Sequence, residues 1–168
     1  DYQLKWQHRL GERDRFMIFI NGTDDAVALI NKKAEGHEPK FAGNLGMSLF
    51  GHNFLLQWKR QQSAAITNLL SLQLGYMGVE VDVFKQITAE LKTIPVAIRE
   101  EFNWQAHQKV KVNTGLDLRL DVQRYDITSP NMDRPGMVGV PLSSRAVLHT
   151  KGEVYMGQIG PFMSVTWD

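Results

Sequence analysis

The chain has 168 residues, of which 19 are Lys or Arg and 18 are Asp or Glu, and it contains no cysteine. The length predicts one domain, and 43% apolar with 22% charged residues is typical of a globular chain. The net charge of +1 argues against nucleic acid or an anionic membrane as the partner, and the lack of cysteine excludes disulfides and cysteine nucleophiles. Because the chain begins with Asp1 and not with Met, we interpret it as a processed product or a fragment.

The first twenty residues are predicted to form two strands. Tyr2, Leu4 and Trp6 alternate with polar residues, which indicates a strand with one apolar side. Residues 11–14 have the composition of a turn, and the continuous apolar run 16–20 predicts a buried strand.

Residues 21–50 are predicted to contain a turn, a short helix and a glycine-rich loop. Asn21-Gly22-Thr23 matches a glycosylation sequon, but Asn-Gly is also a turn signal, and we favour the turn. Thr23 and the two aspartates after it are helix-capping residues, so a short helix is expected up to Gly36. Glycines recur between residues 36 and 53, which predicts a loop there.

Residues 51–104 are predicted to form a helical hairpin. Apolar and long side chains from Leu55 to Tyr76 recur at alternating spacings of three and four, which is typical of an amphipathic helix. Phe84, Ile87, Leu91 and Ile94 repeat the same spacing, and Pro95 begins a further helical segment that reaches about residue 104. We therefore expect two antiparallel helices joined by a short link that contains glycine.

Residues 105–168 change to a strand pattern, and four antiparallel strands are expected there. Apolar residues 116–122 alternate strictly with charged or polar ones, and a shift of the apolar phase near Gln123-Arg124 predicts a β-bulge. A loop is expected over residues 130–139. The dipeptides Lys151-Gly152 and Gly160-Pro161 predict turns between the last three strands. The fold class expected for residues 1–168 is therefore α+β, a single domain with a helical hairpin packed on a mostly antiparallel sheet.

No motif for catalysis or for a cofactor is found. The five histidines do not have the H-E-x-x-H spacing of a zinc site, and the glycines of 43–48 lack the lysine of a phosphate-binding loop. We therefore name no catalytic residue, cofactor or metal, and we expect that the protein is not an enzyme. If it is one, its site would be assembled from dispersed residues, and the first candidates are His107, His149, Asp117 and Asp121.

Aromatic residues near both ends of the chain suggest a protein interface. Tyr2, Trp6, Phe162 and Trp167 are side-chain types that are common in subunit contacts. We take these four as candidate interface residues, in a homo-oligomer or a larger assembly.

Three functions remain open. The first is a non-enzymatic structural or assembly subunit of a virus or phage particle or of a bacterial envelope machine. The second is a module that binds a small hydrophobic ligand, with a helix closing over a curved sheet. The third is the enzyme with a dispersed site. No apolar run reaches the length of a membrane-spanning helix, so we expect a soluble protein without a membrane span, in a virus particle or an extracytoplasmic compartment.

Overall fold

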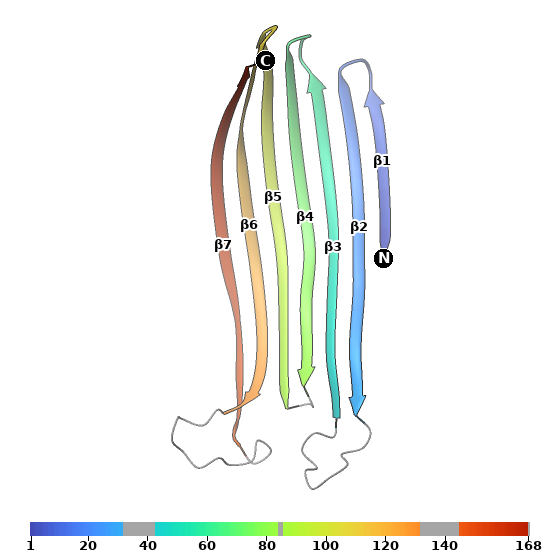
Figure 1. The fold of residues 1–168 in the computed structure, drawn as a ribbon, viewed down its shortest axis with the longest axis vertical. Helices are drawn as coiled ribbons and strands as arrows, with labels where there is room; N and C mark the ends of the chain where they lie inside the picture. The colour runs from blue at the N-terminus through green and yellow to red at the C-terminus, as the bar shows by residue number, and fades with distance from the viewer. Residues whose placement is uncertain (32–42, 84–85, 132–144, 168) are drawn as a thin grey trace.

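The structure, a computed structural model, describes residues 1–31, 43–83, 86–131 and 145–167. In these ranges the chain forms one antiparallel sheet of seven strands, and each strand pairs with the next one along the chain (Figure 1). The strands are β1 Tyr2–Leu10, β2 Asp14–Asn31, β3 Gly43–Gln61, β4 Ile66–Val83, β5 Ile87–His107, β6 Val110–Pro130 and β7 Val147–Trp167. All except β1 have 18 to 21 residues, which corresponds to about 60–70 Å of extended chain.

Three short turns lie at one end of the sheet, the top of Figure 1. They join β1 to β2, β3 to β4 and β5 to β6. In the first of them Gly11 has φ = 74°, a backbone conformation that glycine adopts without a steric penalty. In the second, Gln61 Nε2 donates to the carbonyl oxygen of Ser63 at 2.6 Å, and Thr67 Oγ1 donates to Gln61 Oε1 at 2.9 Å. We call the half of the sheet next to these turns the upper half, and the other the lower half.

The predicted helices are wrong, and with them the α+β fold class, because the described residues form only strands and turns. Residues 51–104 belong to β3, β4 and β5, apart from the turns between them and residues 84–85 outside the described ranges. The spacing of three and four arose because the pattern was read through the β3–β4 turn. Within β4 the alternation is plain, since Leu70, Leu72 and Leu74 lie on one side of the strand and Ser71 and Gln73 on the other.

The other regions predicted as helix or loop before residue 54 also need correction. Residues 23–31, predicted as helix, continue β2, and residues 43–53, predicted as loop, belong to β3. The rest of both predictions falls on residues 32–42, outside the described ranges. Asn21-Gly22-Thr23 lies inside β2 and is not a turn. The strand at the N-terminus and the turn at Gly11 are confirmed.

The C-terminal third has fewer and longer strands than predicted. Lys151-Gly152 and Gly160-Pro161 both lie inside β7, and the two-residue pattern of β6 continues through Gln123-Arg124 without a bulge. The pairing of β5 with β6 instead shifts register between Gln105 and His107. Most of the predicted loop 130–139 lies outside the described residues. The antiparallel pairing itself is confirmed.

The sheet is a single layer without a hydrophobic core in the described residues. The buried positions there are Gly22, Gly75, Gly78, Pro95 and Pro130. Two glycines leave room for an aromatic ring of the neighbouring strand. A Cβ on Gly78 would lie 2.5 Å from the Phe50 ring, and a Cβ on Gly115 would lie 2.5 Å from the Phe162 ring. Packing in this sheet is therefore lateral, between neighbouring strands.

Candidate functional site

The register of the strands assigns each residue to one of two faces. Residues directly opposite each other in an antiparallel pair lie on the same face, and successive residues alternate between faces. Face A carries the even-numbered residues of β1 to β6 and the odd-numbered residues of β7. Face B carries the others. The two faces differ in chemistry, and the difference reverses halfway along the strands.

In its upper half, face A is apolar across all seven strands. We call this surface the apolar band; it consists of the face A residues within 2–6, 16–20, 54–58, 66–76, 94–104, 110–122 and 155–167. Only Asn68, Glu100 and Thr114 interrupt it with polar side chains. Asn68 Nδ2 donates to Glu100 Oε1 at 3.3 Å, and Thr114 Oγ1 donates to the backbone carbonyl oxygen of Phe162 at 3.0 Å, so all three side chains are hydrogen-bonded.

Many side chains of the apolar band are exposed. Ile159, Met163 and Trp167 on β7 have exposures of 74%, 69% and 77%, and Leu70, Ile98 and Leu120 on interior strands are exposed as well. Exposure of interior-strand residues shows that no second layer of the described chain covers this face. A large apolar surface of this kind marks a contact with another protein or with lipid.

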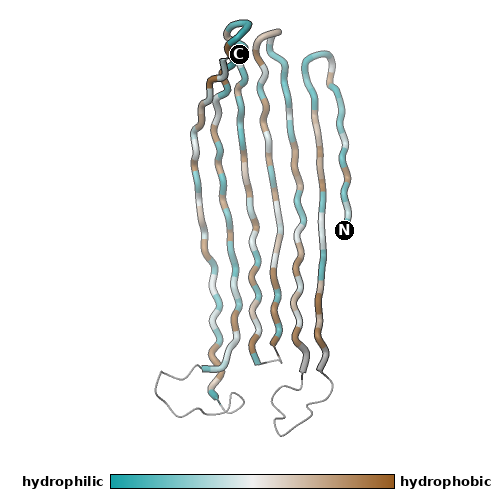
Figure 2. Tube along the Cα trace, in the orientation of Figure 1, coloured by the Kyte–Doolittle hydropathy of each residue, from teal (hydrophilic) through white to brown (hydrophobic). Residues whose placement is uncertain are grey.

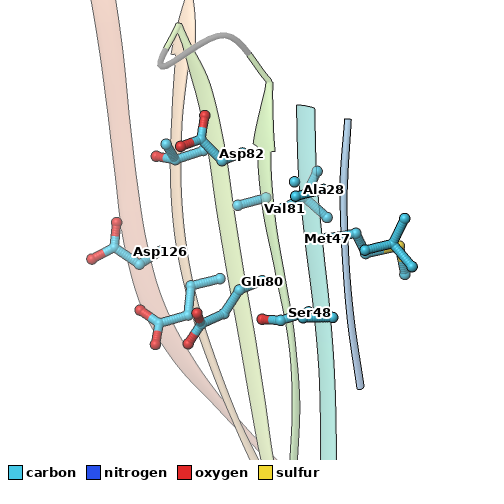
Figure 3. Close-up of a pocket in the computed structure, with 13 residues that line it drawn as sticks. Ala28, Met47, Ser48, Glu80, Val81, Asp82 and Asp126 are labelled. Atoms are coloured by element: carbon cyan, nitrogen blue, oxygen red, sulfur yellow. The ribbon is translucent and has the colours of Figure 1, made fainter. Parts of the chain in front are cut away.

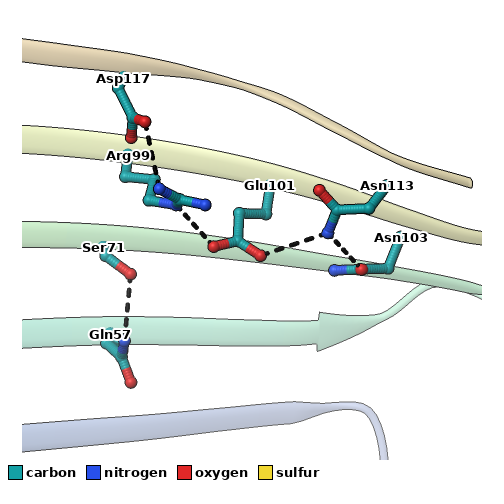
Figure 4. A network of polar contacts seen from close by, with 7 residues as sticks. All are labelled: Gln57, Ser71, Arg99, Glu101, Asn103, Asn113 and Asp117. Carbon is teal, nitrogen blue, oxygen red and sulfur yellow. Dashed lines mark hydrogen bonds and ion pairs between the residues drawn. The ribbon is translucent and has the colours of Figure 1, made fainter. Parts of the chain in front are cut away.

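In its upper half, face B is mainly polar, with Phe19, Leu55 and Leu69 among its apolar exceptions, and it carries a network of hydrogen bonds (Figure 4). Arg99 bridges two strands, with Nε 2.6 Å from Glu101 and a terminal nitrogen 3.1 Å from Asp117. Asn113 Nδ2 donates to Asn103 Oδ1 at 2.6 Å. These groups are partly exposed and bonded to one another, which is the behaviour of a surface in contact with water.

The network extends to the edge strand β7. The Arg99 guanidinium lies 4.4 Å from the centre of the Phe162 ring, which itself lies over Gly115. Further along β6 on the same face, Arg119 Nε lies 2.8 Å from a carboxylate oxygen of Asp121. The guanidinium–ring contact and the ion pairs hold the polar side chains of β5, β6 and β7 in a defined arrangement.

In the lower half the chemistry of the two faces is exchanged. Face A carries ion pairs there, among them Arg124 with Glu153 at 2.6 Å and Lys92 with Glu80 at 3.9 Å. A hydrogen bond from Tyr155 and a second one from Arg124 hold the pKa of the Glu153 carboxyl below its usual range. Face B becomes apolar, with residues such as Met47 and Val81. The tube in Figure 2 shows apolar and polar residues alternating along the strands.

A shallow pocket in the lower half is shown in Figure 3. Three of its four carboxylates, those of Glu80, Asp82 and Asp126, project from face A, whereas Met47 projects to the other side of the strands. The pocket thus takes residues from both faces of a single sheet and is not an enclosed cavity. Within the described residues no three metal-ligating side chains are close enough to hold an ion together.

The structure separates the four predicted interface residues into two pairs. Tyr2 and Trp6 lie on β1 and Phe162 and Trp167 on β7, at opposite edges of the sheet (Figure 1). Tyr2, Trp6 and Trp167 belong to the apolar band, and Phe162 lies on face B. The hydroxyl of Tyr2 lies 3.0 Å from His52 Nδ1, and the Trp6 ring stacks on His8 with centroids 5.5 Å apart.

The residues named for an enzyme do not converge. His107 lies at the upper end of β5, while His149 pairs with Thr128 near the lower end of β6. Asp117 and Asp121 lie on face B, and His149 lies on face A. The apolar band as a continuous surface was not predicted, because Leu69 on face B completed a helical spacing that concealed the alternation within residues 66–76.

No helix in the described residues is long and apolar enough to cross a membrane. No family model matches the chain, and no curated protein or solved structure is similar to it.

Proposed function

We propose that the protein is a non-enzymatic structural subunit whose sheet continues into a larger sheet through its two edge strands. The observation that carries this proposal is that both edge strands, β1 and β7, are exposed along all or nearly all of their length. Every residue of β1 is exposed, and all but three residues of β7 are exposed, although both strands carry several apolar side chains. An uncovered edge of this kind pairs readily with another strand.

The direction of the strands defines the partner. β1 and β7 are the first and last of seven consecutive antiparallel strands, so they run in the same direction (Figure 1). A strand that continues the antiparallel order at either edge must run the opposite way. A second copy in the same orientation offers only edges of the wrong direction, and a copy rotated by about 180° around the normal of the sheet would place its charged lower half beside the apolar band. We infer a different strand as the partner at each edge.

The absence of native cysteine allows a direct test. Single cysteines replace Gln3 on β1 and Gln158 on β7, and matched controls replace Gln57 and Ser71 on the interior strands β3 and β4. All four positions lie on face B, so each variant leaves the apolar band unchanged. Each cysteine is labelled with benzophenone-maleimide in the assembled protein from its native cells, and then irradiated.

We expect covalent adducts heavier than 19.1 kDa from the two edge positions and none from the two interior positions. Edge adducts of twice the chain mass would indicate pairing between copies, which would contradict a different strand as the partner. An absence of adducts at both edges, with a monomeric mass by light scattering, would refute the structural role.

A further inference from the structure

We propose that the apolar band lies against the hydrocarbon of a lipid bilayer. This proposal goes beyond edge pairing, since it concerns a face of the sheet and not its edges, and it replaces the expectation of a soluble protein. Four features of the band carry it: its height, its aromatic borders, the polar face behind it, and its area.

On β4 to β7 the height of the band matches a bilayer, whereas on β1 to β3 the band covers only five residues of each strand, or about 13 Å. On β4 and β5 the band covers 66–76 and 94–104, so each strand contributes ten steps, or about 33 Å of extended chain. The upper ends of the strands are staggered: Asp14 at the end of β2 is in line with Thr114, four residues inside β6. Four residues over four strand spacings incline the upper border of the band by roughly 35°, whereas its lower border, from Ile94 through Val122 to Tyr155, lies in one row across the strands. The hydrocarbon core of a bilayer is about 30 Å thick.

Aromatic residues border the band on both sides. All four tryptophans of the chain, Trp6, Trp58, Trp104 and Trp167, lie in the band and within four residues of the upper ends of their strands. Tyr76 and Tyr155 lie at its lower border, next to the charged lower half of face A. Trp and Tyr concentrate at the two surfaces of a bilayer, because their rings combine an apolar body with a polar group. The core of a water-soluble protein has no reason to arrange its tryptophans along one border.

The opposite face excludes burial between two protein layers. Behind the apolar band, face B carries Arg99, Glu101, Asp117 and Arg119, which are paired with one another and partly exposed. One face in contact with lipid and the other with water accounts for both patterns at the same height of the sheet.

The area of the band also favours a lipid environment. The band covers about 13 Å of each of β1 to β3 and about 33–40 Å of each of β4 to β7, which at about 4.8 Å between strands gives on the order of 900 Å², against about 300–600 Å² for the largest apolar patch of an ordinary monomer. The band extends to both edge strands without a polar rim, which a protein interface would carry. Within hydrocarbon an unpaired strand edge is costly, so lipid contact and edge pairing support each other.

The test is a spin-label scan of β6 in the full chain, reconstituted into vesicles of palmitoyl-oleoyl phosphatidylcholine. Single cysteines replace residues 116–121 one at a time, and each carries a nitroxide. Collision rates are then measured with oxygen, which concentrates in hydrocarbon, and with a nickel chelate, which stays in water. Arg124 and Asp126, on the lower half of face A, serve as controls for the same face outside the band.

We expect an alternation with a period of two. Labels at Leu116, Leu118 and Leu120 should collide more with oxygen, whereas labels at Asp117, Arg119 and Asp121 and at the two controls should collide more with nickel. Low accessibility to both reagents at the three leucines would mean that a protein layer or a second copy covers the band. High nickel accessibility there, or failure of the folded chain to float with vesicles, would equally overturn the proposal.

The scan is independent of the edge test. Oxygen contact at the leucines without edge adducts would leave the lipid proposal standing and refute the structural subunit. Edge adducts together with high nickel accessibility at the leucines would support the structural subunit and refute the lipid proposal.

Discussion

At the scale of single residues, close contacts between neighbouring strands take the place of a core. Gly78, Gly115 and Gly152 lie where a ring of the next strand comes too close for a Cβ. Gly115 is the tightest of these positions, because a Cβ there would collide with the backbone carbonyl oxygen of Glu100 as well as with the Phe162 ring. A backbone atom cannot move aside in the way that a flexible side chain can.

Gly115→Val should therefore destabilise the sheet, by about 1–3 kcal/mol, the usual cost of overpacking a close contact. The measurement is the midpoint of chemical unfolding. Gly157→Val is the matched control, since Gly157 lies in β7 with no atom within 4 Å of its Cβ position. Equal midpoints for the two variants would contradict the contact.

The Glu153 carboxyl shows how one contact controls a charge. The bond from Tyr155 is the first cause of its lowered pKa, and the bond from Arg124 is the second. A lowered pKa in the folded state means that the contribution to stability is fully present above the unfolded pKa and is lost as the pH falls through the folded value.

Tyr155→Phe should raise the pKa of Glu153 towards its ordinary value of about 4.3. Carbon-13 NMR of the glutamate side-chain carboxyls follows the titration directly. Tyr76→Phe keeps the number of phenols equal and should leave the Glu153 pKa where it is. An unchanged pKa in the Tyr155 variant would show that Arg124 alone holds the charge.

At the scale of elements, the β3–β4 turn illustrates how side chains can replace turn glycines. Gln61 accepts a hydrogen bond from Thr67 and donates to Ser63, and the backbone nitrogen of Gln62 donates to the Ile66 carbonyl oxygen at 3.0 Å. This hairpin contains neither glycine nor proline at its tip, which is why no strand end was predicted there.

Gln61→Ala should cost about 1 kcal/mol of unfolding free energy, the usual net value of a hydrogen bond with partners left in place. Chemical unfolding measures the change, with Gln62→Ala at the exposed neighbouring position as the control. The double variant with Thr67→Val should lose less than the sum of the single changes, because the two side chains share a bond. Strict additivity would contradict that shared bond.

At the scale of the whole molecule, the main feature is the exchange of faces at mid-strand. If the apolar side chains lay on the same face along the whole length of about 60 Å, a single layer could cover them all. Here the upper apolar surface lies on face A and the lower one on face B, so the two halves of the sheet face different surroundings. Under the lipid proposal, the upper half lies in the bilayer and the lower half extends beyond it.

Leu72→Arg and Ser71→Arg compare the two faces at neighbouring positions of β4. An arginine on the lipid side near mid-membrane costs about 2–4 kcal/mol, whereas one on the water side is tolerated. We expect the Leu72 variant to lose most of its flotation with phosphatidylcholine vesicles and the Ser71 variant to keep it. Circular dichroism of both variants checks that strand content is preserved, and equal flotation would contradict the assignment of the faces.

The sequence by itself determined the local alternation and the chemistry that the chain lacks. Tyr2, Leu4 and Trp6, and the leucines of 116–120, predicted strands correctly, because the side chains of a strand alternate whatever surrounds them. The same alternation in 66–76 was hidden by Leu69 on the opposite face, which completed a helical spacing.

Only the tertiary structure decided that the strands form one sheet and that their apolar sides combine. Leu72 and Ile98 become neighbours through the pairing of β4 with β5, and Leu118 joins them through β6, 46 residues from Leu72 along the chain. The phase shift after Val122 was visible in the sequence, but whether it marked a bulge or a change of face depended on the register with β5 and β7. Register is set by pairs of residues distant in sequence, and the pattern of a single strand does not contain it.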